Sequence, residues 1–114
     1  MTTDQINQLV IHALEDLKAV DIHSIDVSKL TSIADTMIFA SGRSSRQVKA
    51  LADNTLRVVK EEKITPLGVE GISQGEWALI DLGDVIVHIM QPAVRDYYQL
   101  EKLWTTDSKQ QMNP

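Results

Sequence analysis

The chain has 114 residues, 43% of them hydrophobic, which suits one domain with its own core and leaves little room for a second. It contains no cysteine, which excludes disulfides and a thiol nucleophile, and no stretch approaches the ~20 apolar residues that cross a bilayer. The net charge is −5 and the basic residues are scattered, which disfavours binding to phosphate backbones but allows binding to a basic protein. The N-terminus lacks a charged-then-apolar leader, and we expect a cytoplasmic protein.

The N-terminal third predicts a helix followed by two strands. Thr2 and Gln5 fit a capping box, and apolar residues recur at helical spacing over residues 2–20. Residues 21–27 alternate in the manner of a strand. Residues 36–40 are a short apolar run, which is typical of a strand buried on both faces.

A second helix is predicted shortly after this apolar run. Ser44 and Gln47 fit another capping box, and the helix should extend over residues 45–62. Five residues at helical spacing form its expected buried stripe: Val48, Leu51, Ala52, Thr55 and Val59. Proline and glycine then end the helix, and residues 66–71 have room for a short strand.

The stretch from residue 77 to residue 90 has the pattern of a β-hairpin. Its two apolar runs flank Gly83-Asp84, a two-residue turn signal with glycine first. The pairs expected on one face are all apolar: Leu82 with Val85, Ile80 with Val87, and Ala78 with Ile89. The pairs expected on the other face are Trp77 with Met90, Leu79 with His88, and Asp81 with Ile86. This other face is too apolar for solvent, so a helix of the same chain, a second copy or another macromolecule must cover it.

A final helix is expected from Pro92 to about Trp104, followed by a polar, frayed tail over residues 105–114. A helical wheel places four of its residues in one core-facing arc: Val94, Tyr97, Leu100 and Trp104. Four others remain for a further surface: Arg95, Tyr98, Glu101 and Leu103. Tyrosine and arginine are enriched at interface centres, and the alternative is that Tyr98 and Leu103 pack on the sheet edge.

The elements follow the order α-β-β-α-β-β-β-α, in which helices and strands do not alternate strictly. This order predicts an α+β fold over residues 1–104, with a single mixed β-sheet packed with helices. The chain shows no repeat and no internal linker, so we expect a single domain.

The sequence offers little support for catalysis or metal binding. The loop from Ser41 to Arg46 follows a strand and opens a helix, where free N–H groups and two arginines could hold an anion. It lacks the lysine and the second glycine of a phosphate-binding loop, so a tight turn with an N-cap is the favoured interpretation. Asp81 and Asp84 point to opposite faces at a strand end, which argues against a metal held by paired carboxylates.

Four segments carry a family resemblance: D35–D53 (DTMIFASGRSSRQVKALAD), V69–G71 (VEG), G75–M90 (GEWALIDLGDVIVHIM) and R95–W104 (RDYYQLEKLW). With these segments the chain resembles the ribosomal silencing factor family, also called iojap-like proteins. The resemblance implies a sheet similar to a nucleotidyltransferase-like core without catalytic carboxylates. It also implies a protein that is no enzyme and uses no cofactor or metal.

The resemblance further implies a partner. Family members bind large-subunit ribosomal protein fourteen on the large ribosomal subunit, block subunit joining and repress translation when nutrients are short. Free members often form homodimers. The residues that match the family's recurrent positions, and are expected to bind the partner, are Trp77, Asp81, His88, Arg95, Tyr98, Leu100, Glu101 and Trp104. Trp77 is the expected apolar anchor and Tyr98 an amphipathic contact, while Asp81 and Glu101 would meet basic side chains. Leu100 and Trp104 would mainly support the surface from the core.

Two alternatives from other classes remain open. One is a nucleotidyltransferase-like enzyme that uses the loop from Ser41 to Arg46, against which the carboxylate geometry counts. The other is a homodimeric scaffold that buries the second hairpin face between two copies. The scaffold is compatible with a silencing factor if the dimer hides the binding face until the ribosome is met.

Overall fold

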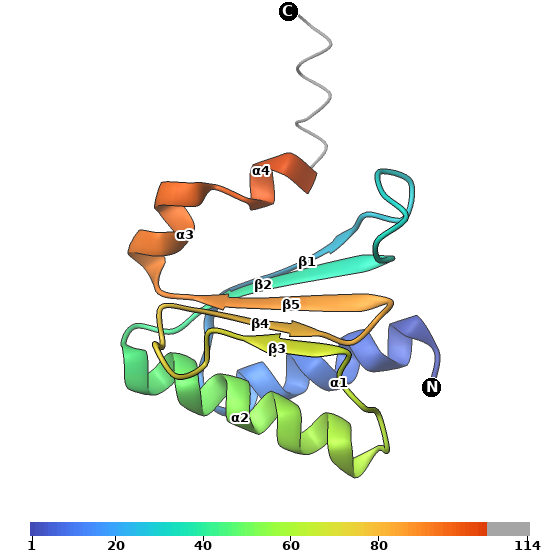
Figure 1. Cartoon of the computed structure of the whole chain (residues 1–114), viewed down its shortest axis with the longest axis horizontal. Coiled ribbons are helices and arrows are strands. Elements are labelled where there is room, and N and C mark those ends of the chain that lie inside the picture. The colour runs from blue at the N-terminus through green and yellow to red at the C-terminus, as the bar shows by residue number, and fades with distance from the viewer. Residues whose placement is uncertain (105–114) are drawn as a thin grey trace, which may run out of the picture.

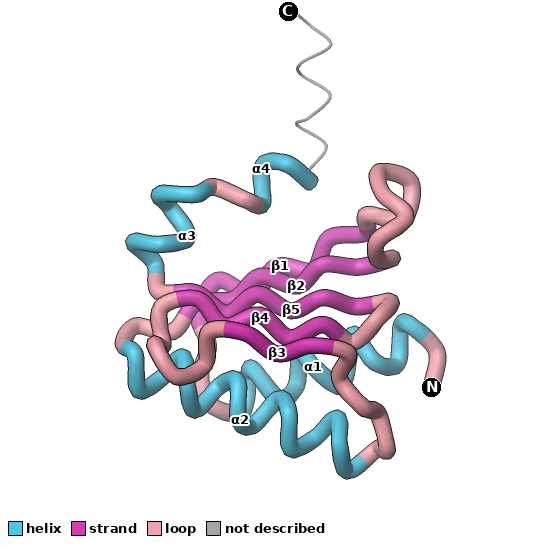
Figure 2. The backbone as a smooth tube through the Cα atoms, in the orientation of Figure 1, coloured by secondary structure: helices cyan, strands magenta, loops and turns pink. Residues whose placement is uncertain are grey.

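Five strands form one mixed sheet in the computed structural model, in the order β1-β2-β5-β4-β3 (Figure 2). The strands are β1 (Val20–Asp26), β2 (Thr36–Ser41), β3 (Gly68–Glu70), β4 (Trp77–Asp81) and β5 (Val85–Met90). The helices are α1 (Thr3–Asp16), α2 (Ser45–Glu61), α3 (Pro92–Tyr98) and α4 (Glu101–Trp104). The structure describes residues 1–104, and the tail predicted over residues 105–114 lies outside them. The predicted α+β fold with a single mixed sheet is confirmed, whereas the likeness to a nucleotidyltransferase core stays a prediction.

The sheet separates two apolar layers (Figure 1). Helices α1 and α2 cover one face, and their buried side chains pack on the apolar side of the hairpin. The five residues predicted as the inner stripe of α2 are all buried there. Helices α3 and α4 lie over the opposite face, which we call the second face. Within residues 1–104, no helix is long and apolar enough to cross a membrane.

Side-chain caps fix the starts of the two long helices. Thr2 and Gln5 form the predicted capping box at α1, each side chain bonded to the backbone N–H of the other. At α2, Ser44 Oγ accepts a hydrogen bond from the Gln47 N–H at 3.1 Å, but the side-chain amide of Gln47 bonds to groups other than the Ser44 N–H. Its Oε1 accepts from the Arg43 N–H, and its Nε2 donates to two carbonyl groups just after α1. The second capping box is therefore half formed, and Gln47 joins the two helices.

The hairpin has the predicted register. Strands β4 and β5 pair antiparallel, with Trp77 opposite Met90 and Leu79 opposite His88. The turn uses Gly83, whose φ of +91° is a conformation that favours glycine. On its other side β5 pairs in parallel with β2, so it lies at the centre of the sheet and all its residues are buried.

Two glycines fix the polar turn that precedes β4. Gly71 has a φ of +80°, and a Cβ atom there would lie 2.0 Å from the carbonyl oxygen of Trp77. Gly75 has a φ of +70°, and its Cβ would lie 2.7 Å from Ser45. Because backbone lies this close, both positions require glycine. The turn therefore delivers Trp77 to the first position of β4.

The end of the first predicted helix and the continuity of the final one are wrong. Lys18 adopts a left-handed conformation with a φ of 64°, so the first helix stops before its predicted limit at residue 20. The final helix breaks at Gln99, whose φ is 51° and whose N–H bonds to the Arg95 carbonyl. The break turns the following residues relative to an ideal helix, so one predicted wheel does not describe both halves. Tyr97, predicted in the core-facing arc, is 80% exposed.

Candidate partner-binding surface

The second face of the sheet is covered by the chain itself. The residues buried in this layer are Val27, Ala34, Met37, Phe39, Ile86 and Met90. Val94 of α3, Leu100 of the residue pair between the two helices and Trp104 of α4 pack against them. We call this whole segment, residues 92–104, the C-terminal arm. The second face was expected to be covered by a helix of the same chain, a second copy or another macromolecule. The structure shows the first of these. Leu100 and Trp104 are partly buried, and their role as support for a binding surface stays a prediction.

His88 is buried within this layer rather than placed at its surface. The imidazole is 6% exposed and stacks on Phe39 with ring centroids 4.8 Å apart. Trp77 Nε1 donates a hydrogen bond to His88 Nδ1 at 3.1 Å. An indole N–H can only donate, so Nδ1 carries no proton and the ring is neutral. Burial lowers the pKa of His88 to about 4, which agrees with that state. His88 therefore holds Trp77 in place and does not itself reach the surface.

Three aromatic rings form a row from the sheet to the outside, which we call the aromatic row (Trp77, Tyr98 and Tyr97). The Trp77 and Tyr98 rings lie 5.2 Å apart at a tilt of 46°, and Tyr97 meets Tyr98 edge-on at 4.9 Å. Trp77 is partly buried, whereas Tyr98 is 54% exposed. The solvent-facing part of the row is thus mainly tyrosine. Tyr97 was predicted in the core because residues 92–104 were put on one helical wheel, whereas the helix breaks at Gln99.

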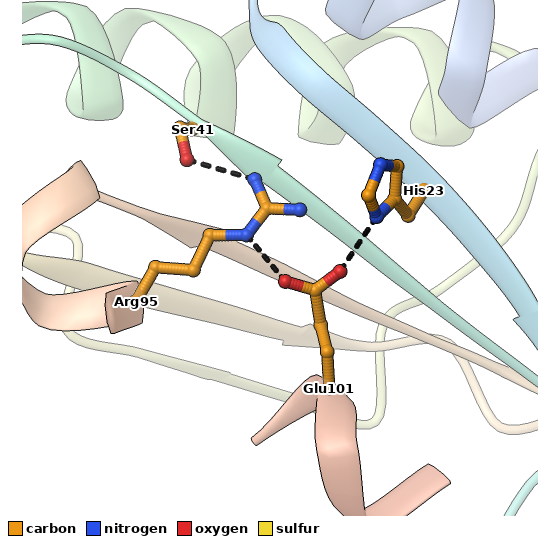
Figure 3. A network of polar contacts seen from close by, with 4 residues as sticks. All are labelled: His23, Ser41, Arg95 and Glu101. Carbon is orange, nitrogen blue, oxygen red and sulfur yellow. Dashed lines mark hydrogen bonds and ion pairs between the residues drawn. The ribbon is translucent and has the colours of Figure 1, made fainter. Parts of the chain in front are cut away.

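Arg95 and Glu101 point toward the sheet instead of outward (Figure 3). Arg95 Nε donates to Glu101 Oε1 at 2.7 Å, and Arg95 Nη1 donates to Ser41 Oγ at 2.8 Å. The other carboxylate oxygen of Glu101 lies 2.7 Å from Nδ1 of His23. Burial tends to raise the pKa of Glu101, but the hydrogen bonds and charges of Arg95 and His23 outweigh it and leave the pKa lowered. These four residues are the polar network of the arm.

Ser41 and His23 were not among the predicted site residues. Each lies far from its partner along the chain: Ser41 and Arg95 are 54 positions apart, and His23 and Glu101 are 78 positions apart. The sequence contains one weak signal, since Ser41 places a hydroxyl directly after the apolar residues 37–40. Nothing in the sequence marks His23.

Asp81 has a structural task of its own. It follows Trp77 by four strand positions on the same face, so the two lie about 13 Å apart along β4. Its Oδ1 accepts a hydrogen bond from the Gly83 N–H at 2.9 Å, which closes the hairpin turn. The structure therefore brings together Trp77, His88 and Tyr98, and joins Arg95 to Glu101, while Asp81 lies apart from both groups.

The loop from Ser41 to Arg46 forms a turn and an N-cap. Ser44 caps α2, and the Gln47 side chain occupies the Arg43 N–H, so two of the N–H groups near this helix start already have partners. Arg43 and Arg46 are exposed. Among residues 1–104, no group of three or more histidine, aspartate or glutamate side chains is placed to hold a metal ion.

Comparisons with known proteins point to one family. A family model described as "Ribosomal silencing factor during starvation" matches residues 1–114. The ribosomal silencing factor of Chromobacterium violaceum is 53% identical over 104 residues, which cover 91% of this chain and 85% of that protein. A crystal structure of a protein from the same organism matches with a TM-score of 0.90 at 53% identity, covering 91% of this chain and 87% of that one. A mouse protein named for mitochondrial assembly of the ribosomal large subunit is 30% identical over 88% of this chain and 45% of its own length.

Proposed function

Since the chain belongs to the ribosomal silencing factor family, we propose that it binds the large ribosomal subunit and represses translation. The proposed contact on that subunit is large-subunit ribosomal protein fourteen, and the proposed effect is steric: the bound protein blocks joining of the small subunit. The observation that carries the proposal is the aromatic row, an exposed cluster held by packing to the sheet. The proposed setting is the cytoplasm under nutrient limitation, and a homodimer of the free protein stays a prediction.

The aromatic row has the features of an interaction centre. Tyrosine and tryptophan present large amphipathic areas and lose little conformational entropy on binding, so they are enriched among residues that dominate binding energy. Tyr98 is held between Trp77 and Tyr97, which restricts its ring before a partner arrives. The net charge of −5 suits a basic ribosomal protein, because complementary charge raises the association rate. The mouse relative is named for assembly of the ribosomal large subunit, which supports the proposal that this chain binds the large subunit.

The proposed mechanism requires no chemistry from this chain. The Asp81 carboxylate is engaged in the hairpin turn, and the Ser41 hydroxyl accepts from Arg95. The enzyme alternative has its own test, which is calorimetric titration of the purified protein with nucleotides and magnesium. Micromolar nucleotide binding that disappears in Arg43→Ala would favour an enzyme over the steric mechanism.

Co-sedimentation with ribosomal subunits tests the proposal. Lysate of starved cells is fractionated on a sucrose gradient at low salt, and the protein is expected with free large subunits and depleted from joined ribosomes. Tyr98→Ala should weaken binding to purified large subunits by roughly thirtyfold, about 2 kcal/mol, because it truncates the exposed part of the aromatic row. Leu67→Ala is the control, since Leu67 is an apolar residue, 74% exposed, that directly precedes the edge strand β3 and lies outside the aromatic row. Wild-type protein that stays at the top of the gradient, or a Tyr98→Ala variant as strong as wild type, would refute the proposal.

A further inference from the structure

The arm depends on the rest of the molecule for its structure. Helix α3 has seven residues, α4 has four, and neither contributes a buried side chain to the described structure. Helices shorter than about 12 residues are marginal in water by themselves. The arm therefore keeps its two helices only while it is docked on the sheet, and a lifted arm would lose them.

The polar network divides into an arm part and a sheet part. Arg95 and Glu101 both belong to the arm and pair with each other, so that ion pair can survive when the arm lifts. The two contacts that reach the sheet are Arg95 with Ser41 on β2 and Glu101 with His23 on β1 (Figure 3). These two are the polar contacts of the network that lifting must break, in addition to the apolar packing of Val94, Leu100 and Trp104 on the sheet. Both involve charged groups, whose hydrogen bonds are stronger than neutral ones.

The surroundings of the network leave room for movement. Beside it lies an open cleft of about 440 Å³, and its lining includes Asp21, Ser41, Pro92, Arg95, Gln99 and Glu101. The two helices of the arm meet at Gln99, the residue with left-handed backbone. The arm is thus bordered by an open cleft on this flank and changes direction at Gln99, whereas α1 and α2 pack on the main core.

We propose that Ser41 and His23 are positioning residues that latch the arm onto the sheet, and that the latched arm is the form that binds the large ribosomal subunit. The inference rests on the proposed function, because the latch holds Tyr98 against Trp77 in the aromatic row. A surface that is ordered in advance binds without the cost of ordering it, so loss of the latch lowers the fraction of molecules competent to bind. Ser41 is 2% exposed, so it acts on the partner through Arg95 and not by contact.

Hydrogen–deuterium exchange measures the latch directly, because a lifted arm exposes the backbone amides of residues 93–104, which follow Pro92. In Ser41→Ala these amides should exchange about tenfold faster than in wild type, as expected for loss of one hydrogen bond to a charged group. Ser41→Ala/His23→Ala should exchange faster still, and Ser41→Thr, which keeps the hydroxyl, should behave like wild type. Amides of α1 and α2 should not change. The matched control is Thr55→Val, which removes a buried hydroxyl that donates to the Leu51 carbonyl away from the arm.

Affinity for purified large subunits, measured on the same variants, tests the link to binding. The double variant should bind about tenfold more weakly or worse, and Thr55→Val should bind like wild type. Unchanged arm exchange in the double variant, or exchange that accelerates equally in α1 and α2, would overturn the latch. If the arm exchanges faster but the affinity for large subunits is unchanged, the latch has no role in binding. If wild type itself does not bind large subunits while arm exchange responds as expected, the proposed function fails and the latch stands.

Discussion

The buried imidazole of His88 should make folding stability depend on pH. Its pKa is lowered from 6.5 to about 4 in the folded state, so the unfolded chain takes up a proton first as the pH falls. Protonation therefore favours unfolding: this part of the stability is complete above pH ~6.5, is lost progressively below it, and is fully lost near pH ~4. The full shift corresponds to about 3 kcal/mol, of which about 2 kcal/mol is lost by pH ~5.

The assay is denaturant unfolding at pH 7 and pH 5, with the free energy of unfolding extrapolated to water. His88→Asn keeps an acceptor near the Nδ1 position for Trp77 and removes the titration, so its stability should change much less over this range. His12→Gln is the matched control, since His12 is exposed on α1 and its replacement should leave the pH dependence as in wild type. A wild-type loss below about 0.5 kcal/mol, or the same loss in His88→Asn, would refute the buried neutral imidazole.

Three further substitutions test the layer around the aromatic row, with unfolding free energy as the common readout. Trp77→Ala should cost about 2 kcal/mol of stability as well as partner binding, because the ring is partly buried and bonded to His88; unchanged stability would place Trp77 wholly at the interface. Asp81→Ala should cost about 1 kcal/mol through the lost bond to the Gly83 N–H, and no change would show that the turn does not need it. Gly71→Ala should cost about 3 kcal/mol or more, because its Cβ would overlap the Trp77 carbonyl; wild-type stability would contradict the tight turn.

The sequence predicted those parts of the fold that local rules determine. The two-residue loop at Gly83 set the hairpin register, because side chains alternate strictly along a strand and one face was wholly apolar. Ser44 located the start of α2 because its side chain satisfies an N–H group that the helix leaves free. Such features depend on neighbours a few residues away, so one sequence suffices to read them.

The parts that were missed depend on long-range contacts. The left-handed backbone of Gln99 broke the final helix, although glutamine is an ordinary helix former and gave no warning. Because of that break, residues 100–104 do not continue the faces of α3, so the single wheel that placed Tyr97 in the core was wrong, and Glu101 meets His23. Similarly, His88 and Arg95 matched the resemblance, yet the sequence could not show that His88 is buried or that Arg95 reaches Ser41 across the sheet.

A subunit-joining assay tests the central claim most directly. Purified large subunits are incubated with this protein, small subunits are added, and joining is followed by light scattering. We predict that wild-type protein at saturating concentration suppresses joining, and that Tyr98→Ala at the same concentration suppresses it much less. Full joining of subunits that carry bound wild-type protein would contradict the claim that the protein acts by blocking the small subunit.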